Sequence, residues 1–405
     1  MYDLLKMKNE WSRAQAIQFA RGLIQTASPS LSENAAANLV AQEMRKIGYD
    51  KVVQDTAGNV VGVMLGMQAG PTILLNSHLD TVDWKGDTWE RDPLGGEVSD
   101  GKLFGIGAAD CKGGLAAQVY AGDLLKRSLL PLKGNLIVSA TVAEQNGRSP
   151  GIRTLMEQTL PDLELKPDYA VLGEPTGLGL YYGHDGWMEV EIVVQGANPF
   201  HVDDATRSIA KDLNASNGSS SGRFAWAARE PRFQDTPGGR RAVIQADRRL
   251  TSSESSEDVI RQLKHEANLV VNGSGSVAVE VAICQEYQQM YTGKTTVVRQ
   301  LVNSWTTDPF SPLVERARQS LSAGGCEVRP GKWELGRSGM GTAGGMLVKE
   351  FNLPTIGYGP GAEQQAHAVD EYVETDKIAQ AIYGTALIAH SLVGIPVFGW
   401  TSDEI

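Results

Sequence analysis

The feature that most constrains the fold is a repeated alternation between helical patterns and short, mainly apolar segments. Three such segments are 72–75 (TILL), 135–141 (NLIVSAT) and 168–173 (DYAVLG). A short apolar run bounded by polar residues or Gly is typical of a strand buried on both faces. Helices alternating with such strands predict an α/β fold with a mostly parallel central sheet flanked by helices. Ligands of such sheets bind at the carboxyl ends of the strands.

The N-terminal part of the chain predicts two helices and then two strands. Residues 12–27 (SRAQAIQFARGLIQTA) have helical periodicity, and a second helix spans 32–48, with Ser32 as its cap and Gly48 at its end. Strand-like segments lie on both sides of a turn at Gly58. Another helix is predicted at 112–126, and 353–361 (LPTIGYGPG) is predicted to be a buried strand that leads into a Gly-rich turn.

The pattern changes in the middle of the chain. Residues 187–196 (WMEVEIVVQG) alternate between apolar and polar side chains, which indicates a half-exposed strand. Similar strands are predicted at 240–250 and 275–287, with a helix at 255–268 between them, and 214–222 (NASNGSSSG) is expected to be a mobile loop. We therefore expect an inserted α+β domain.

The length of 405 residues supports this division, because a single hydrophobic core stops growing at roughly 250–300 residues. We expect one discontinuous domain of residues 1–182 and 298–405, which carries an inserted domain of residues 183–297.

Charge and composition exclude several classes of function. The net charge is −11 and no block of Lys and Arg occurs, which argues against a nucleic-acid partner. No apolar segment approaches the roughly 18 residues of a membrane span, and the N-terminus lacks the apolar core of a signal peptide. We expect a cytoplasmic protein that does not act on membranes.

The cysteines predict neither disulfides nor a thiolate metal site. Cys111, Cys284 and Cys326 are an odd number, are widely spaced and form no C-x-x-C pair. Any bound metal is therefore expected to have His and carboxylate ligands.

His78 and Asp80 directly follow the first of the buried strands. Because side chains alternate along an extended chain, both point to the same side, and Asp80 could accept the imidazole N–H of a metal-binding His78. The alternative is a polar pair that only stabilises a turn.

Other predicted strands end in similar residues. Asp110 precedes a Gly-Gly helix start, where it could cap the helix or ligate a cation. Glu144 follows the strand at 135–141, Glu174 lies before a proline, and His367 lies in a loop after a strand. The glycines around Asp110 do not have the spacing of a phosphate-binding loop. Five junctions that each present a His or a carboxylate indicate a shared site.

The motifs SHLDTVD, GIGAADCKGGLAA, AEQNG, GEPT and GPGAEQQAHAVDEYV occur in this order along the chain. This set resembles the zinc-dependent deacylase and exopeptidase family of acetylornithine deacetylase, succinyl-diaminopimelate desuccinylase, aminoacylase and glutamate carboxypeptidase. The resemblance covers essentially the whole chain. It implies a catalytic domain, with the insert as a lid or dimerisation domain.

The resemblance also implies roles for individual residues. His78 and Glu174 resemble ligands of one zinc, and Asp110 resembles the carboxylate that bridges two zincs. His367 resembles a ligand of the second zinc. Asp80 would orient His78, and Glu144 matches the general base that takes a proton from the attacking water and passes it to the leaving amine. Ligands of this type suit Zn²⁺, Co²⁺ or Mn²⁺.

The sequence departs from the family pattern at several positions. Gln145 stands where a second carboxylate usually binds the metal held by His367, so the second metal site is expected to be weak or lost. Asp185 stands where the family often has Arg. His201 resembles a histidine that reaches across a dimer to the active site, but it lies one residue later than usual, and a plain exposed histidine is the alternative.

Two further segments bear on the substrate. Arg249, in a D-R-R-L run that matches the family, is a candidate for binding a substrate carboxylate, with a surface salt bridge as the alternative. The Gly-rich stretch 336–345 (GRSGMGTAGG) is a second candidate for carboxylate binding and departs from the family pattern.

Together these observations predict a metal-dependent hydrolase of the amide bond of an N-acyl amino acid or small peptide, active through metal-activated water and Glu144. It would hold one or two zinc ions and form a homodimer through the insert. The alternative is an inactive homologue that acts as a binding protein, because Gln145 replaces an expected ligand.

Overall fold

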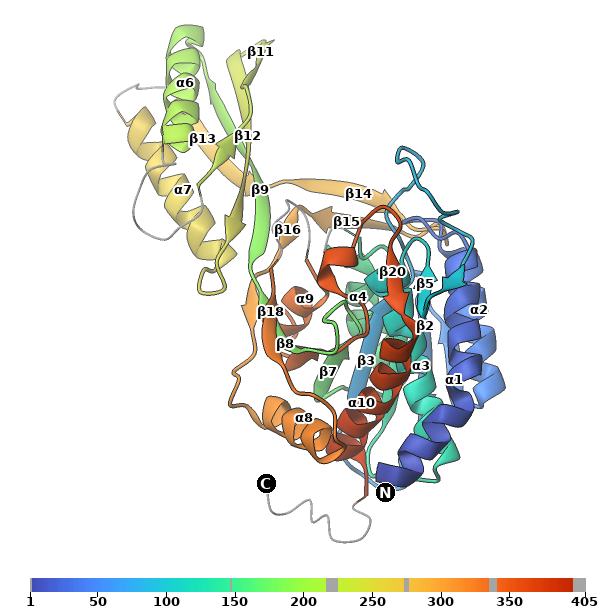
Figure 1. Cartoon of the computed structure of the whole chain (residues 1–405). Helices are drawn as coiled ribbons and strands as arrows, with labels where there is room; N and C mark the ends of the chain where they lie inside the picture. The colour runs from blue at the N-terminus through green and yellow to red at the C-terminus, as the bar shows by residue number, and fades with distance from the viewer. Residues whose placement is uncertain (1, 146–147, 216–224, 273–276, 335–340, 396–405) are drawn as a thin grey trace.

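The computed structural model describes residues 2–145, 148–215, 225–272, 277–334 and 341–395. A nine-stranded sheet forms the centre of its larger part (Figure 1). The strand order is β1-β2-β6-β3-β7-β19-β8-β17, and β18 pairs with β8. Its strands are β1 (Lys51–Gln54), β2 (Val60–Met64), β3 (Ile73–His78), β6 (Leu136–Thr141), β7 (Tyr169–Leu172), β8 (Leu180–His184), β17 (Trp305–Thr306), β18 (Pro330–Trp333) and β19 (Thr355–Gly357).

The middle of this sheet is parallel and buried on both faces. β6, β3, β7 and β19 are parallel to one another, and antiparallel strands flank them on both sides. Ile73 and Leu75 of β3 pack into one hydrophobic cluster, whereas Leu74 between them packs into another. The predicted fold class, a mostly parallel sheet flanked by helices with an α+β insert, is confirmed.

Helices cover both faces of the sheet. One face packs against α1 (Tyr2–Gln25), α2 (Asn34–Ile47), α3 (Gly113–Arg127), α8 (Pro312–Ala323) and α10 (Thr375–Val393). The other face packs against α4 (Pro150–Thr154), the turn η2 (Leu155–Thr159), α5 (Leu160–Asp162) and α9 (Gly344–Lys349).

The main part of the chain also contains a second, small sheet and two short turns. A three-stranded sheet combines β4 (Val98–Ser99), β5 (Lys102–Phe104) and β20 (Tyr372–Glu374). The turns η1 (Ala108–Lys112) and η4 (Glu363–Gln365) lie beside it in the chain.

The insert has its own sheet and its own core. The chain leaves the central sheet after His184 and enters the insert at Gly186, and it returns between Val302 and Trp305. The insert contains β9 (Gly186–Gly196), β10 (Ala227–Ala228), β11 (Arg232–Thr236), β12 (Gly239–Leu250), β13 (Val277–Ile283) and β16 (Leu301–Val302), with α6 (Pro199–Ala215) and α7 (Ser256–Val271). It projects away from the central sheet (Figure 1).

A hairpin reaches from the base of the insert back over the main domain (Figure 1). Its strands are β14 (Gln285–Gln289) and β15 (Thr295–Arg299). The Tyr291 hydroxyl donates to the carbonyl oxygen of Gly58 at 2.9 Å, and Lys294 Nζ donates to Thr154 Oγ1 at 3.1 Å. The single strand predicted at 275–287 is therefore wrong, because the chain changes sheet at Cys284.

Other local predictions also need correction. The first helix starts at Tyr2, ten residues earlier than the helical pattern indicated, and α6 was missed. Ser32 does not cap the second helix, since α2 begins at Asn34 after Glu33, whose side chain makes no capping bond. Most of the loop expected at 214–222 lies outside the described residues. Among the helices that are described, none is long and apolar enough to cross a membrane.

Candidate metal centre

The carboxyl ends of β3 and β7 bring three of the predicted metal ligands together. His78 is the last residue of β3, Glu174 follows β7, and Asp110 lies in the turn η1. His78 Nε2 is 3.1 Å from Asp110 Oδ1 and 3.8 Å from Glu174 Oε2. Ligand atoms of a tetrahedral zinc site, with bonds of about 2.0–2.1 Å, are roughly 3.4 Å apart. The observed spacings therefore fit one divalent metal ion.

Asp110 lies between two imidazoles. Its Oδ2 is 3.1 Å from His367 Nε2, while its Oδ1 faces His78. Although burial opposes the effect, hydrogen bonds from the two histidines lower the pKa of Asp110. A carboxylate that presents one oxygen to each of two histidines has the arrangement of a group shared by two metal ions.

The turn that carries Asp110 is held by a buried carboxylate. Glu371 Oε1 accepts the backbone N–H groups of Ala109 at 2.7 Å and Asp110 at 2.9 Å, and Oε2 accepts that of Gly107 at 2.7 Å. Three amides on one side chain fix the path of the chain at Asp110. Glu371 is thus a support for the centre rather than a ligand.

The electrostatics of the cluster favour a cation. Burial, opposed by His78 and reinforced by Asp110, raises the pKa of Glu174 to about 8. Burial and the charge of Glu174 raise the pKa of Glu144 well above its usual range. Glu174 Oε1 is buried without a hydrogen-bond partner. Buried carboxylates of this kind need a counter-charge, which a divalent metal ion would supply.

Cys111 belongs to the same cluster, which the sequence did not indicate. Its Sγ lies within 4.8 Å of the candidate ligand atoms of His78, Asp110 and Glu174. It also accepts the backbone N–H of His78 at 3.0 Å, and burial raises the pKa of the thiol to about 12. A neutral thiol engaged by the backbone is a poor ligand, so the donor set remains one imidazole and two carboxylates.

Asp80 is fully buried beneath His78 and connects it to Glu144. The atom nearest to His78 Nδ1 is the backbone carbonyl oxygen of Asp80 at 2.8 Å, and the carboxylate Oδ1 is 3.4 Å away. The carboxylate accepts the backbone N–H groups of Glu144 at 3.1 Å and Gln145 at 3.0 Å. The expected bond from the imidazole to the Asp80 carboxylate is thus made chiefly by the backbone of that residue.

Glu144 lies within the cluster. Its Oε2 is 3.8 Å from His78 Nε2, and Ser149 Oγ donates to its Oε1 at 3.2 Å. Only 3% of Glu144 is exposed, and the adjacent Gln145 is also buried. The carboxylate is therefore held in a dry position beside the candidate metal ligands.

The two predicted substrate-binding residues lie in the insert. Arg249 is on β12, and its Nη2 is 3.4 Å from Asp185 Oδ2. His201 is exposed near the start of α6, a helix that packs against α7 and the strands β9, β10 and β12 of the insert. The structure of one chain does not bring His201 to the candidate metal centre. Residues 335–340, which include most of the Gly-rich stretch, lie outside the described residues.

Several supporting residues were not identified from the sequence. They are Glu33, Ser149 and Glu371, which bond to the backbone or side chains of the segments that carry Glu144 and Asp110. Glu371 lies four residues after His367 within one of the motifs, so its position carried a signal. Glu33 carried none, because it acts on a segment 110 residues away that only folding brings near. Ser149 lies only five residues after Glu144, but no pattern in the sequence marked it as a partner of that carboxylate.

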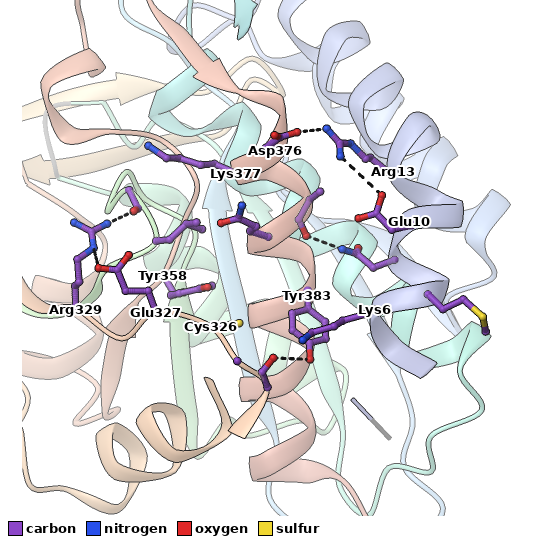
Figure 2. Close-up of a pocket in the computed structure, with 18 residues that line it drawn as sticks. Lys6, Glu10, Arg13, Cys326, Glu327, Arg329, Tyr358, Asp376, Lys377 and Tyr383 are labelled. Carbon is purple, nitrogen blue, oxygen red and sulfur yellow. Dashed lines mark hydrogen bonds and ion pairs between the residues drawn. The ribbon is translucent and has the colours of Figure 1, made fainter. Parts of the chain in front are cut away.

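A surface recess of about 690 Å³ lies apart from this centre (Figure 2). It is lined by α1, α10 and residues 324–329, and it contains none of the predicted metal ligands. Arg13 pairs with Asp376 and Arg329 lies beside Glu327 (Figure 2). Its charges largely compensate one another, so the recess offers no comparable chemistry.

Comparisons with known proteins agree with this geometry. The chain matches the family model described as peptidase family M20/M25/M40 over residues 74–391. The uncharacterized protein YgeY of Escherichia coli (strain K12) is 28% identical over 393 residues, covering 91% of this chain and 92% of that protein. An acetylornithine deacetylase of Shigella sonnei (strain Ss046) is 34% identical over 205 residues, covering 48% of this chain and 51% of that protein.

A solved structure shares the fold. The Bacillus subtilis YXEP protein, described as a dinuclear metal-binding peptidase, superposes with a TM-score of 0.68 at 14% identity, over 94% of this chain and 98% of that chain. At this identity the likeness shows the fold alone, and the chemistry has to be argued from the residues.

Proposed function

Since the chain belongs to peptidase family M20/M25/M40, as the resemblance of its motifs predicted, we propose that it removes the acyl group of an N-acyl amino acid or cleaves a small peptide. Hydrolysis of amide and peptide bonds is the activity of this family, so the chain is a hydrolase of that class.

The observation that carries the proposal is the placement of Glu144 beside the candidate ligands. Its Oε2 is 3.8 Å from His78 Nε2, and His78 is in turn 3.8 Å from Glu174. A divalent metal at this point would acidify a water molecule and polarise the substrate carbonyl. Glu144 would take the proton of the attacking water and return it to the leaving amine.

We assign His78, Asp110 and Glu174 as the ligands of one firmly bound metal. His367, on the other side of Asp110, would hold a second metal together with Gln145. A neutral amide oxygen is a weaker ligand than a carboxylate, so this second site should be loosely occupied. Imidazole and carboxylate ligands suit Zn²⁺, with Co²⁺ or Mn²⁺ as alternatives.

The remaining assignments are proposals of the same kind. Arg249 would bind the substrate carboxylate, which requires its guanidinium to exchange Asp185 for the ligand. The insert would pair two chains, and His201 would serve the active site of the partner. We further propose a cytoplasmic location and a role in amino-acid metabolism, without nucleic-acid or membrane partners.

A kinetic assay tests the function. Purified protein loaded with Zn²⁺, Co²⁺ or Mn²⁺ is tested on a panel of N-acetyl amino acids and dipeptides, beside Glu144→Gln. We expect the variant to lose about 10²–10⁴-fold in kcat, since a general base contributes that much. Asp123→Asn is the matched control, because Asp123 is a buried carboxylate in α3 outside the centre. Equal turnover by Glu144→Gln would refute the mechanism.

Gln145 also favours a second candidate, an inactive homologue that keeps the fold and binds a ligand without hydrolysis. Counting metal ions in protein purified without chelator separates the two. One equivalent or more per chain, with turnover of any substrate in the panel, supports the hydrolase. Metal-free protein that stays inactive after metal is added supports the binding protein.

A further inference from the structure

Three consecutive backbone amides at Glu144 donate to two buried carboxylates from distant parts of the chain. The N–H of Ala143 donates to Glu33 Oε1 at 3.0 Å. Those of Glu144 and Gln145 donate to Asp80 Oδ1 and Oδ2 at 3.1 and 3.0 Å. Neither carboxylate is exposed. The segment that carries the proposed base is therefore held through its backbone.

Glu33 is placed unusually for the start of a helix. It is the residue that precedes α2, but its side chain makes no capping bond to that helix. Its Oε1 instead accepts the N–H groups of Leu31, at 2.9 Å, and of Ala143, which lies 110 residues further along the chain. The Glu33 carboxylate thus does not cap α2 and instead makes a long-range contact with the backbone of Ala143.

Ala143 needs such a contact. Its φ is +53°, in the left-handed region that residues with a Cβ rarely adopt. A conformation of this kind persists only when surrounding structure determines it. Because Ala143 directly precedes Glu144, a relaxation of its backbone would turn the Glu144 side chain away from His78.

The segment that carries Glu33 is itself fixed against the end of β3. Ser28 Oγ donates to the backbone carbonyl oxygen of Leu79 at 2.8 Å. The backbone N–H of Thr81 donates to the carbonyl oxygen of Ser28 at 2.9 Å. Ser30 Oγ donates to Asp80 Oδ2 at 2.5 Å. The segment that carries Glu33 is therefore attached by hydrogen bonds to the residues that follow His78, and we expect the two segments to move together.

We propose that Glu33 is a positioning residue for hydrolysis, which holds Ala143 in its left-handed conformation and so aims Glu144 at the reacting water. The inference rests on the proposed role of Glu144 as general base. The hydrogen bonds of Glu33 go to the backbone of Leu31 and Ala143 and not to a candidate metal ligand. Its loss should therefore lower kcat and leave metal content and KM unchanged.

Two substitutions test whether the length or the charge of the Glu33 side chain is needed for its contact with Ala143. Glu33→Gln keeps an acceptor oxygen at the same distance from Ala143. Burial and the charge of Asp80 already raise the pKa of Glu33 to about 7, so a neutral side chain of the same shape is compatible with the site. Glu33→Asp keeps the charge but is one methylene too short to reach the amide.

The experiment compares these variants with Glu33→Ala and with Asp123→Ala as control. Asp123 is likewise buried with one carboxylate oxygen unpartnered, and it lies in α3 away from the centre. We expect kcat to fall about 10–100-fold for Glu33→Asp and Glu33→Ala, because a displacement of about 1 Å costs about that much. Glu33→Gln should stay within about threefold of the unaltered chain, with KM and metal content unchanged in every variant.

Amide hydrogen exchange of residues 142–145 supplies a readout that does not depend on activity. Exchange should accelerate at least about tenfold in Glu33→Asp and remain unchanged in Glu33→Gln and Asp123→Ala. Unchanged exchange in Glu33→Asp, or an equal loss of kcat in Glu33→Gln, would overturn the positioning role. If the unaltered chain hydrolyses nothing while exchange behaves as expected, the proposed function fails and the backbone contact stands.

Discussion

The strongest prediction concerns Glu174, which should destabilise the metal-free protein. Burial, opposed by His78 and reinforced by Asp110, raises the pKa of this carboxyl from 4.5 to about 8. Below pH 4.5 both the folded and the unfolded chain are protonated here, so no penalty exists. As the pH rises towards 8, the unfolded chain ionises and the folded chain does not, so stability is lost.

The magnitude follows from the size of the shift. Each pKa unit corresponds to 1.36 kcal/mol, so at pH 7 Glu174 costs the metal-free protein about 3 kcal/mol of unfolding free energy. Glu174→Gln removes the charge, and its amide can donate to the neighbouring Asp110 carboxylate. For a chain of 405 residues this gain corresponds to a rise in Tm of roughly 4 °C.

The assay is thermal unfolding at pH 5 and pH 7.5, with chelator and with Zn²⁺. With chelator, Glu174→Gln should exceed the unaltered chain in Tm at pH 7.5, and the difference should shrink at pH 5. With Zn²⁺ the order should reverse, because the variant lacks a ligand and gains less from metal binding. Glu254→Gln is a control of opposite sign: although burial opposes it, Thr251 and Arg248 lower the pKa of Glu254.

The reasoning would be refuted if metal-free Glu174→Gln were less stable than the unaltered chain at pH 7.5. That result would mean that the carboxylate is already compensated without a metal. The candidate metal centre would then lack its electrostatic basis.

Three further predictions concern the second metal, the substrate and the core. Gln145→Glu should raise metal content from one towards two equivalents per chain and should raise kcat, since it restores a charged ligand; unchanged metal content by elemental analysis would contradict this. Arg249→Ala should raise KM about tenfold or more for substrates with a free carboxylate and leave esters of the same substrates unaffected; equal KM values for both would favour a structural salt bridge with Asp185. Trp305→Ala should cost about 3–5 kcal/mol in denaturant unfolding, because Trp305 is fully buried; a loss below about 1 kcal/mol would count against close packing there.

Much of the fold could be read from the sequence because its signals are local. The runs that became β3, β6 and β7 are apolar on both faces, and this pattern is typical of parallel strands covered on both sides. The half-exposed alternation of β9 likewise predicted a second sheet with one covered face. The hairpin of β14 and β15 was missed because no local pattern marks the residue at which a strand changes sheet.

In the candidate site, too, some residues could be predicted from the sequence and others could not. By itself, the sequence determined that His78, Asp110, Glu144, Glu174 and His367 end or follow predicted strands, and a shared sheet edge was enough to expect them together. Residue types and order along the chain carry that information, because parallel strands bring their carboxyl ends to one side.

Only the tertiary structure decided how the site is supported. Glu33 and Asp80 receive the amides of the segment around Glu144, and Glu371 receives those around Asp110. These contacts join side chains to backbone groups that lie 64 to 264 positions away in the chain. A backbone amide has no sequence signature, so its partner becomes visible only when the chain is folded.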